Sequence, residues 1–348
     1  MPDPIRRGAK RPTLEDVARE LGVSHQTVSR VINSHPRVLP QTRARVLAKI
    51  ESLGYQPNRA ARFLANQHST LVGLVASDSR SYGPAHALLS IQLEAQRHGY
   101  TMMTIGLSKC TISEVKKAAQ ELMANAAQGV IIDLPFEINR RELHAALGDI
   151  PFVGLDIDGG SLFPSFRFDH AHGARTATRH LIDLGHKKIA GLIGEPPWRS
   201  HRLRKRGWLD ALTESRLEPG PYLQTPWTAE GGYEATERLI QKSFSRFSAI
   251  FAANDLIALG SMLALHERGI RVPEEISVVG FDGMPEAQFF YPSLTTVIID
   301  FDVLAKESLH SLFALIQRSK NEPIHKIGLP KLIQRQSTGS PRNEWISE

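Results

Sequence analysis

Residues 13–33, Thr-Leu-Glu-Asp-Val-Ala-Arg-Glu-Leu-Gly-Val-Ser-His-Gln-Thr-Val-Ser-Arg-Val-Ile-Asn, predict two short helices joined by a tight turn. Thr13 and Asp16 have the spacing of an N-cap and an acid in the first helical turn, and Gly22 ends that helix. Ser24 then caps the second helix. The apolar positions of the first helix recur at helical spacing and are Leu14, Val17, Ala18 and Leu21. This arrangement is a helix-turn-helix pattern.

The second helix has two faces of different chemistry. Its inward positions are apolar, and its outward positions carry side chains that can bond to base edges or phosphates in a DNA major groove. A helical hairpin with a merely polar surface is the structural alternative. The inward residues are Val28, Val31 and Ile32, and the outward residues are His25, Gln26, Ser29, Arg30 and Asn33.

Positive charge is concentrated at the N-terminal end of the chain. Residues 1–66 carry 12 Lys+Arg and 5 Asp+Glu, a net charge of +7, whereas the remaining residues carry 30 and 31, a net charge of −1. A basic segment binds a polyanion because each phosphate contact releases condensed counterions. Since the excess coincides with the helix-turn-helix, it favours DNA as the partner.

Length and composition exclude several classes of protein. The 348 residues are enough for two or three domains, and 41% hydrophobic with 22% charged residues is typical of a globular protein. We find no apolar run of about 20 residues and no signal peptide, so we expect a cytoplasmic, nucleoid-associated protein without membrane contact. The single Cys110 excludes an internal disulfide and a cysteine-rich zinc site. We expect no metal and no cofactor.

The rest of the chain divides into segments with different hydrophobic patterns. A third helix is predicted over 41–53, and residues 59–69 form a hinge with a helix too short to be stable without a partner. From Thr70 onward, short β-branched runs alternate with helical patterns, which predicts parallel sheets in βαβ units. The predicted strands are 71–75, 100–105, 129–133, 151–155, 188–193, 249–252 and 277–280, and the predicted helices are 87–99, 113–124, 140–147, 173–184, 202–215, 231–241 and 255–268.

The predicted fold is an all-α helix-turn-helix headpiece followed by an α/β core of two doubly wound parallel-sheet lobes of the periplasmic-binding-protein type. Ligands of such lobes bind beyond the carboxyl ends of the strands. No glycine-rich dinucleotide or P-loop motif follows a predicted strand. The predicted bounds are 12–58 for the headpiece, 59–69 for the hinge helix and linker, about 70–168 with 299–328 for the N-lobe, about 169–298 with 329–338 for the C-lobe, and 339–348 for a tail.

Segment order and motifs resemble the lactose-repressor (LacI/GalR) family of bacterial transcription regulators. The resemblance extends from about Pro12 to Thr338, and within the family the chain is most similar to the member that gives the family its name. The motifs are residues 13–33, Gly54-Tyr-Gln-Pro-Asn58, His180-Leu-Ile-Asp-Leu-Gly-His-Lys-Lys-Ile189, Arg202-Leu-Arg204, Gly207-Trp208, Ala253-Asn-Asp255, Ile276-Ser-Val-Val-Gly-Phe-Asp282 and Pro292-Ser-Leu-Thr-Thr296.

This resemblance implies a set of DNA-binding residues. His25, Gln26 and Arg30 match base-reading positions, and Leu64 matches a leucine that family members wedge into the minor groove. His25 stands where the name-giving member has tyrosine and Arg62 where it has glutamine, so the operator sequence stays open. The remaining implied contacts are Thr13, Ser24, Thr27, Ser29, Asn33, Arg37, Tyr55, Asn58, Ala61 and Arg62.

The resemblance also implies an effector pocket for a hydroxyl-rich ligand. Carboxylates and amides bond pairs of hydroxyls, an arginine supplies a fork of donors, and aromatic faces cover the apolar side of a sugar. Trp198 occupies a place where the name-giving member has a small polar residue, so the pocket is reshaped. The implied pocket residues are Ser77, Asp156, Trp198, Arg202, Trp227, Asn254, Asp282 and Phe301.

Together these features predict a transcriptional repressor of sugar utilisation genes. The expected effector is a galactoside or related oligosaccharide that releases the protein from double-stranded operator DNA. The tail is too short for a leucine-heptad helix, so a homodimer is expected. A periplasmic-type sugar-binding protein and a purine-responsive regulator of the same family stay open as alternatives. Catalysis by Asp156 with Asp158, or by Asp255 with His266, is disfavoured because this spacing also suits helix caps and surface positions.

Overall fold

A computed structural model describes residues 12–32, 35–55, 69–77, 81–243, 247–317 and 325–341. It divides into two compact units, Met1–Ser69 and Thr70–Glu348. Most of the predicted hinge lies outside the described residues, and so do five of the implied DNA contacts: Asn33, Asn58, Ala61, Arg62 and Leu64.

The first unit holds the predicted helix-turn-helix. Thr13 accepts a hydrogen bond from the Asp16 backbone N–H, while the Asp16 side chain accepts one from the Thr13 backbone, which completes a capping box. Gly22 ends the first helix with φ of 66°, a left-handed conformation that glycine adopts without steric penalty. The Ser24 hydroxyl accepts from the Thr27 N–H at 3.2 Å and caps the second helix. The helices are α1 (Leu14–Leu21), α2 (His25–Ile32) and α3 (Pro40–Leu53).

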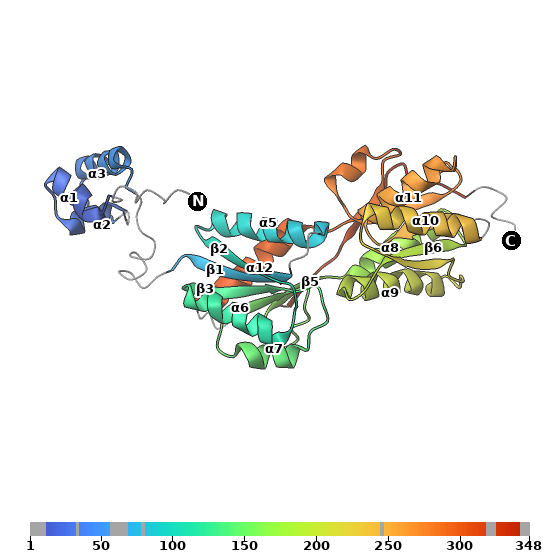
Figure 1. Ribbon diagram of the computed structural model, residues 1–348, viewed down its shortest axis with the longest axis horizontal. Coiled ribbons are helices and arrows are strands. Elements are labelled where there is room, and N and C mark those ends of the chain that lie inside the picture. The colour runs from blue at the N-terminus through green and yellow to red at the C-terminus, as the bar shows by residue number, and fades with distance from the viewer. Residues whose placement is uncertain are drawn as a thin grey trace, which may run out of the picture. The chain divides into compact units, whose positions relative to one another are not determined.

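The N-lobe of the second unit is a six-stranded parallel sheet with the strand order β11-β5-β4-β3-β1-β2. Figure 1 shows helices on both faces of this sheet. Its strands are β1 (Leu71–Ser77), β2 (Thr101–Leu107), β3 (Ala127–Asp133), β4 (Phe152–Leu155), β5 (Ser165–Phe168) and β11 (His325–Gly328), and its helices are α5 (Tyr82–Arg97), α6 (Ile112–Ala124), α7 (Arg140–Leu147) and α12 (Phe301–Ile316).

The C-lobe repeats this architecture with the strand order β12-β10-β9-β8-β6-β7, in which only β12 is antiparallel to its neighbour. The prediction of two doubly wound lobes, made from the βαβ pattern, is confirmed. Its strands are β6 (Ile189–Gly194), β7 (Tyr222–Thr225), β8 (Ala249–Ala252), β9 (Ser277–Asp282), β10 (Thr295–Ile298) and β12 (Lys331–Ile333), and its helices are α8 (His170–Asp183), α9 (Arg199–Glu214), α10 (Ala229–Ser243), α11 (Asp255–Glu267) and the 3₁₀ helix η2 (Pro285–Phe289).

Within the described residues, the chain passes from one sheet to the other at three places: between β5 and α8, between β10 and α12, and between β11 and β12. Buried apolar residues of both lobes meet in one continuous core beside these crossovers. The crossovers therefore bring strand ends from the two sheets together, which is where the ligand site was expected. Nowhere in the ranges given above is a helix both long and apolar enough to cross a membrane.

Several predicted element bounds are wrong. α5 begins at Tyr82 rather than residue 87, α8 at His170 rather than 173, and α9 at Arg199 rather than 202. In α9 the first turn is held by the Arg199 N–H, which donates to the Pro135 carbonyl of the other lobe at 2.7 Å. A tertiary partner of this kind leaves no local sequence pattern. Five short strands, β5, β7, β10, β11 and β12, were also missed. The four-residue strands β4 and β8 were predicted because they are continuous apolar runs, a signal that His325–Gly328 and Lys331–Ile333 lack.

Candidate DNA-reading face and ligand cavity

Helix α2 presents a polar face to the outside of the headpiece. Val28 and Val31 are buried in the headpiece core, whereas His25, Gln26 and Arg30 are exposed. Thr27 and Ser29 lie half-buried between these two faces. The division between apolar and polar positions follows the helical period that the sequence indicated. The exposed groups offer ring nitrogens, an amide and a guanidinium, which are the donors and acceptors that read base edges.

The other implied DNA contacts of the headpiece have different surroundings. The Thr13 and Ser24 hydroxyls hold the N-termini of α1 and α2, and Arg37 is exposed on the loop before α3. Tyr55 is only 9% exposed and packs in the headpiece core with Val17 and Val46. Its implied DNA contact stays a prediction. Its position directly after the C-cap Gly54 returns the chain toward the core.

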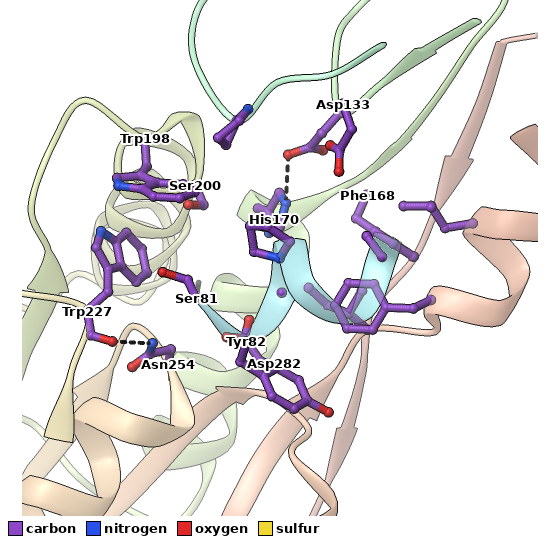
Figure 2. Close-up of a pocket in the computed structure, with 18 of the residues that line it drawn as sticks. Ser81, Tyr82, Asp133, Phe168, His170, Trp198, Ser200, Trp227, Asn254 and Asp282 are labelled. Carbon is purple, nitrogen blue, oxygen red and sulfur yellow. Dashed lines mark hydrogen bonds and ion pairs between the residues drawn. The ribbon is translucent and has the colours of Figure 1, made fainter. Parts of the chain in front are cut away.

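A cavity of about 720 Å³, including its open mouth, lies between the two lobes. Figure 2 shows Trp198, Trp227 and Asn254 on one side and Asp133 and Phe168 on another. The residues that line it are Ser81, Tyr82, Gly83, Pro84, Ala87, Asp133, Pro135, Asp156, Phe168, His170, Trp198, Ser200, Arg204, Trp227, Asn254, Asp282, Ile299, Phe301 and Leu304.

A buried ion pair forms the floor of the C-lobe side. The Arg204 guanidinium of α9 donates to the Asp282 carboxylate at the end of β9 across 2.7 Å, and the two side chains are 5% and 8% exposed. Arg204 also donates to the Ala253 carbonyl at 2.5 Å. Its guanidinium carbon lies 3.8 Å from the centroid of the Phe281 ring. A buried charge is stable only when it is paired and hydrogen-bonded, and Arg204 meets both conditions.

Asp156 is the corresponding carboxylate of the N-lobe side. It follows β4, and its Oδ2 lies 3.3 Å from Nε2 of His170, which begins α8. Burial raises the pKa of Asp156, but His170, Arg199 and Arg204 outweigh this effect and hold that pKa below its usual value. Its Oδ1 is buried and has no hydrogen-bond partner among the described residues. An unpartnered carboxylate oxygen beside a cavity is suited to accept a hydrogen bond from a ligand.

Both of these carboxylates sit on strained backbone. Asp156 has φ of 50° and Asp282 has φ of 107°, in the left-handed region that side chains other than glycine rarely adopt. Such strain is maintained where the surrounding structure holds it, and it concentrates at ligand sites. The two residues occupy equivalent places, directly after or at the end of a strand, one in each lobe.

Aromatic rings cover the remaining wall. Trp198 and Trp227 meet edge to face with their centroids 6.3 Å apart, and Trp198 also lies 5.7 Å from the Phe136 ring of the other lobe. Asn254 donates from its side-chain amide to the Trp227 carbonyl at 3.3 Å and caps α11 with its oxygen (Figure 2). Flat apolar faces next to carboxylates and an amide are the surroundings that a sugar ring requires, since it has polar edges and apolar faces.

Six implied pocket residues line this cavity: Asp156, Trp198, Trp227, Asn254, Asp282 and Phe301. Two do not. Ser77 lies at the end of β1 outside the lining, and Arg202 has 59% of its side chain exposed and pairs with Glu137. Residues two apart on a helix point about 200° apart, so Arg204 faces the cavity and Arg202 faces solvent.

Three charged lining residues were absent from the predicted pocket: Asp133, His170 and Arg204. Asp133 is the last residue of β3, and the rule that ligands bind beyond strand ends could have found it. The motif Arg202-Leu-Arg204 contained the correct arginine, and the buried stripe of Trp208 and Ala211, four and seven residues after Arg204, is the signal that could have placed Arg204 on the inward face of α9. His170 became visible only once the chain crossover was known.

Both parts of the chain resemble known proteins. Residues 13–58 match the family model described as bacterial regulatory proteins, lacI family, and residues 178–338 match a periplasmic binding protein-like domain. The chain is 33% identical to the lactose operon repressor of Escherichia coli (strain K12), over 96% of this chain and 93% of that protein. The chain belongs to the lacI family of bacterial regulatory proteins. It is a DNA-binding transcriptional regulator of that family, built of a helix-turn-helix headpiece and a two-lobed core.

Other relatives of this lacI-family chain are regulators too. The HTH-type transcriptional repressor PurR of Haemophilus influenzae (strain ATCC 51907 / DSM 11121 / KW20 / Rd) is 31% identical over 94% of this chain and 99% of that protein. Among solved structures, a lac repressor dimer bound to operator and the anti-inducer ONPF matches with a TM-score of 0.84 at 33% identity, over 95% of this chain and 100% of that chain. A complex of the regulator CelR with cellobiose matches with a TM-score of 0.67 at 27% identity, over 94% of this chain and 100% of that chain.

Proposed function

We propose that this lacI-family regulator is a homodimeric repressor that leaves its operator when a sugar binds between the lobes. It acts in the cytoplasm on nucleoid DNA and has no catalytic role. The regulated genes serve the uptake or breakdown of a galactoside or related oligosaccharide. The observation that carries the proposal is the cavity at the crossovers, where strained carboxylates from both lobes face one ligand space.

The DNA-binding half rests on the face of α2. His25, Gln26 and Arg30 are its exposed base-reading candidates, and the basic excess of residues 1–66 supplies attraction to phosphates. Thr27, Ser29 and Arg37 are candidate phosphate contacts around this face. Base contacts specify a sequence and phosphate contacts position the protein, so both sets are required.

The homodimer rests on two exposed apolar stripes. Leu89 and Leu93 are exposed on α5, and Leu259 and Leu263 are exposed on α11, in each case four residues apart on one helix face. Contiguous apolar surface of this kind marks protein interfaces. The related lac repressor was solved as a dimer on its operator. Two headpieces in one dimer would read a near-palindromic site.

The sugar effector rests on the acceptors and rings of the cavity. Asp156 and Asp282 can accept from pairs of hydroxyls, while Trp198 and Trp227 can cover an apolar ring face. Relatives were solved with the ligands ONPG and cellobiose. A purine is the second candidate, because the same rings could stack on a base.

The DNA-binding half is tested with the full-length protein and DNA from upstream of its own gene in a gel-shift titration. We expect binding that is specific at moderate salt and is lost in Arg30→Ala. Arg19→Ala, which removes an exposed arginine of α1 paired with Asp16, is the matched control and should bind with little change. The absence of sequence-specific binding by the unmodified protein would refute this half.

The effector half is tested by adding galactosides, other oligosaccharides and purine bases to the protein–DNA complex. Ligand and DNA affinities must change reciprocally, so a ligand that releases DNA binds more weakly when DNA is present. Asp282→Asn should abolish the response but keep DNA binding. A ligand that strengthens DNA binding instead would reverse the proposed direction of control.

A further inference from the structure

The charged groups that line the cavity are unbalanced. Asp133, Asp156 and Asp282 contribute three carboxyl groups, whereas Arg204 is the one arginine or lysine among the described lining residues. Asp282 is neutralised by its 2.7 Å contact with Arg204. Asp156 lies 3.3 Å from the His170 ring, and Arg199 donates to the Asp156 backbone carbonyl. Asp133 therefore has no counter-charge of its own.

Arg204 has little capacity left for a negatively charged ligand. Its donors already serve the Asp282 carboxylate, the Ala253 carbonyl and Nδ1 of His170, the last at 3.4 Å. Phe281 covers one face of the guanidinium. Among the described lining residues, a phosphate or carboxylate would thus find no lysine or arginine that is free to bind it. Anion sites normally offer such a free fork or ammonium group.

His170 does not change this balance. Its Nδ1 accepts from Arg204 at 3.4 Å and its Nε2 lies 3.3 Å from the Asp156 carboxylate, so both ring nitrogens already have partners. Tyr82 adds a neutral hydroxyl, because burial and the charge of Asp282 raise its pKa to about 12. Among the described lining residues, a ligand consequently meets no free cationic group.

Asp133 is the last residue of β3, and Asp156 directly follows the neighbouring strand β4. The parallel register pairs Asp133 of β3 with Leu155 of β4, so Asp156 is one residue further along. Among the described residues, the Asp133 carboxyl makes no hydrogen bond or ion pair. Burial and the like charge of Asp156 raise its pKa to about 7. A half-buried carboxyl without a partner gains most from a ligand that brings positive charge.

We infer that Asp133 determines effector specificity by charge: the cavity takes a sugar or polyol without phosphate or carboxylate, and it binds an amino sugar more tightly than the neutral parent. This inference rests on the effector site proposed above. An ammonium group near Asp133 gains a charge-assisted hydrogen bond. A neutral hydroxyl gains an ordinary one, and an anion meets like charge in a site of low dielectric.

Matched sugars test this order directly. The full-length protein is titrated calorimetrically at pH 7 with glucose, galactose and mannose, each also as its 2-amino, uronic acid and phosphate derivative. In each series that binds, we expect the amino sugar to bind about tenfold more tightly than the neutral parent, and the acid and phosphate about tenfold more weakly. An acid or phosphate that binds as tightly as its parent overturns the inference, and so does an amino sugar without an advantage.

Two variants assign the effect to the residue. Asp133→Asn should reduce the advantage of the amino sugar to less than about threefold and should strengthen binding of the acidic derivatives. Asp158→Asn removes the same charge from an exposed site 3.8 Å from Arg140, and it should leave the order unchanged. Equal effects of the two variants would overturn the role of Asp133. If Asp133→Asn does not fold, the sugar series with the unmodified protein still decides the charge preference.

The outcome also separates this inference from the proposed function. If sugars bind, but their affinities do not fall from the amino derivative through the neutral parent to the acid and phosphate derivatives, only the inference is overturned. The absence of binding by every monosaccharide and by the galactosides and oligosaccharides tested above overturns both the effector site and the inference.

Discussion

The Arg204 guanidinium and the Asp282 carboxylate form an ion pair of 2.7 Å in which both side chains are more than nine-tenths buried. Arg202, two residues earlier on the same helix, pairs with Glu137 where both side chains are more than half exposed. The two arginines thus allow one experiment that separates a buried pair from an exposed one.

Arg204→Met should destabilise the core by about 3–5 kcal/mol, because it leaves the Asp282 charge buried without a partner. Arg202→Met should change stability by less than about 1 kcal/mol, since exposed pairs are screened by solvent. Urea unfolding followed by circular dichroism measures both values. Equal losses in the two variants would contradict the assignment of Arg204 to the buried site.

Gly194→Ala should weaken effector binding with little loss of DNA binding. A Cβ at Gly194, the last residue of β6, would overlap the Trp227 ring, so that ring must move. Because Trp227 lines the cavity, its displacement removes a stacking surface. Ligand titration by tryptophan fluorescence measures the effect. Gly99→Ala is a control away from the cavity: its Cβ would meet no atom within 4 Å, and although φ of 77° makes an alanine there cost stability, the effector affinity should be unchanged.

His186 should make the C-lobe less stable in acid. Nε2 of the ring donates to the Gly339 carbonyl at 2.9 Å, and the Ser248 and Ser277 hydroxyls lie 2.8 and 3.1 Å from Nδ1 and Nε2. Burial lowers the pKa of His186 from 6.5 to about 4. The unfolded state therefore binds more protons between these values. Stability is fully present above about pH 6.5 and is lost as the pH falls toward about 4, by at most about 3 kcal/mol.

The raised pKa values of Asp133 and Asp255, each about 7, act in the opposite direction over the same pH range. In these two groups the folded state binds more protons, so their contribution to stability falls as the pH rises. Comparison of the unmodified protein with His186→Gln isolates the histidine. Between about pH 6.5 and 4, the free energy of unfolding of the variant should fall less than that of the unmodified protein. Identical pH profiles would refute the role of His186.

Leu259→Glu combined with Leu263→Glu should dissociate the homodimer. Both side chains are exposed on α11, so in the monomer the charges cost little, whereas at an interface they would be buried without partners. Sedimentation velocity measures the change in mass. Leu329→Glu is the control at an exposed leucine between β11 and β12. A dimer that persists in the double variant would place the interface elsewhere.

Local sequence rules located much of the candidate site. In α2 the 3.6-residue period separates buried Val28 and Val31 from exposed His25, Gln26 and Arg30. Elsewhere, the family resemblance supplied Asp156, Asn254 and Asp282, which sit at or just past predicted strand ends and all line the cavity. These rules succeed because each depends on the geometry of a single element.

Two features could not be predicted because the deciding contact joins residues distant in sequence. The first turn of α9 is held by the Pro135 carbonyl of the other lobe. His170 lines the cavity because the chain crosses from one sheet to the other between β5 and α8.

By itself the sequence determined the helix-turn-helix, the two parallel-sheet lobes, the family and the strand ends at which a ligand binds, since hydrophobic period and capping are local properties of the chain. Only the tertiary structure decided which charges are paired. Arg204 neutralises Asp282 while Asp133 is left without a partner, because three crossovers between the lobes determine which strand ends and helix starts meet.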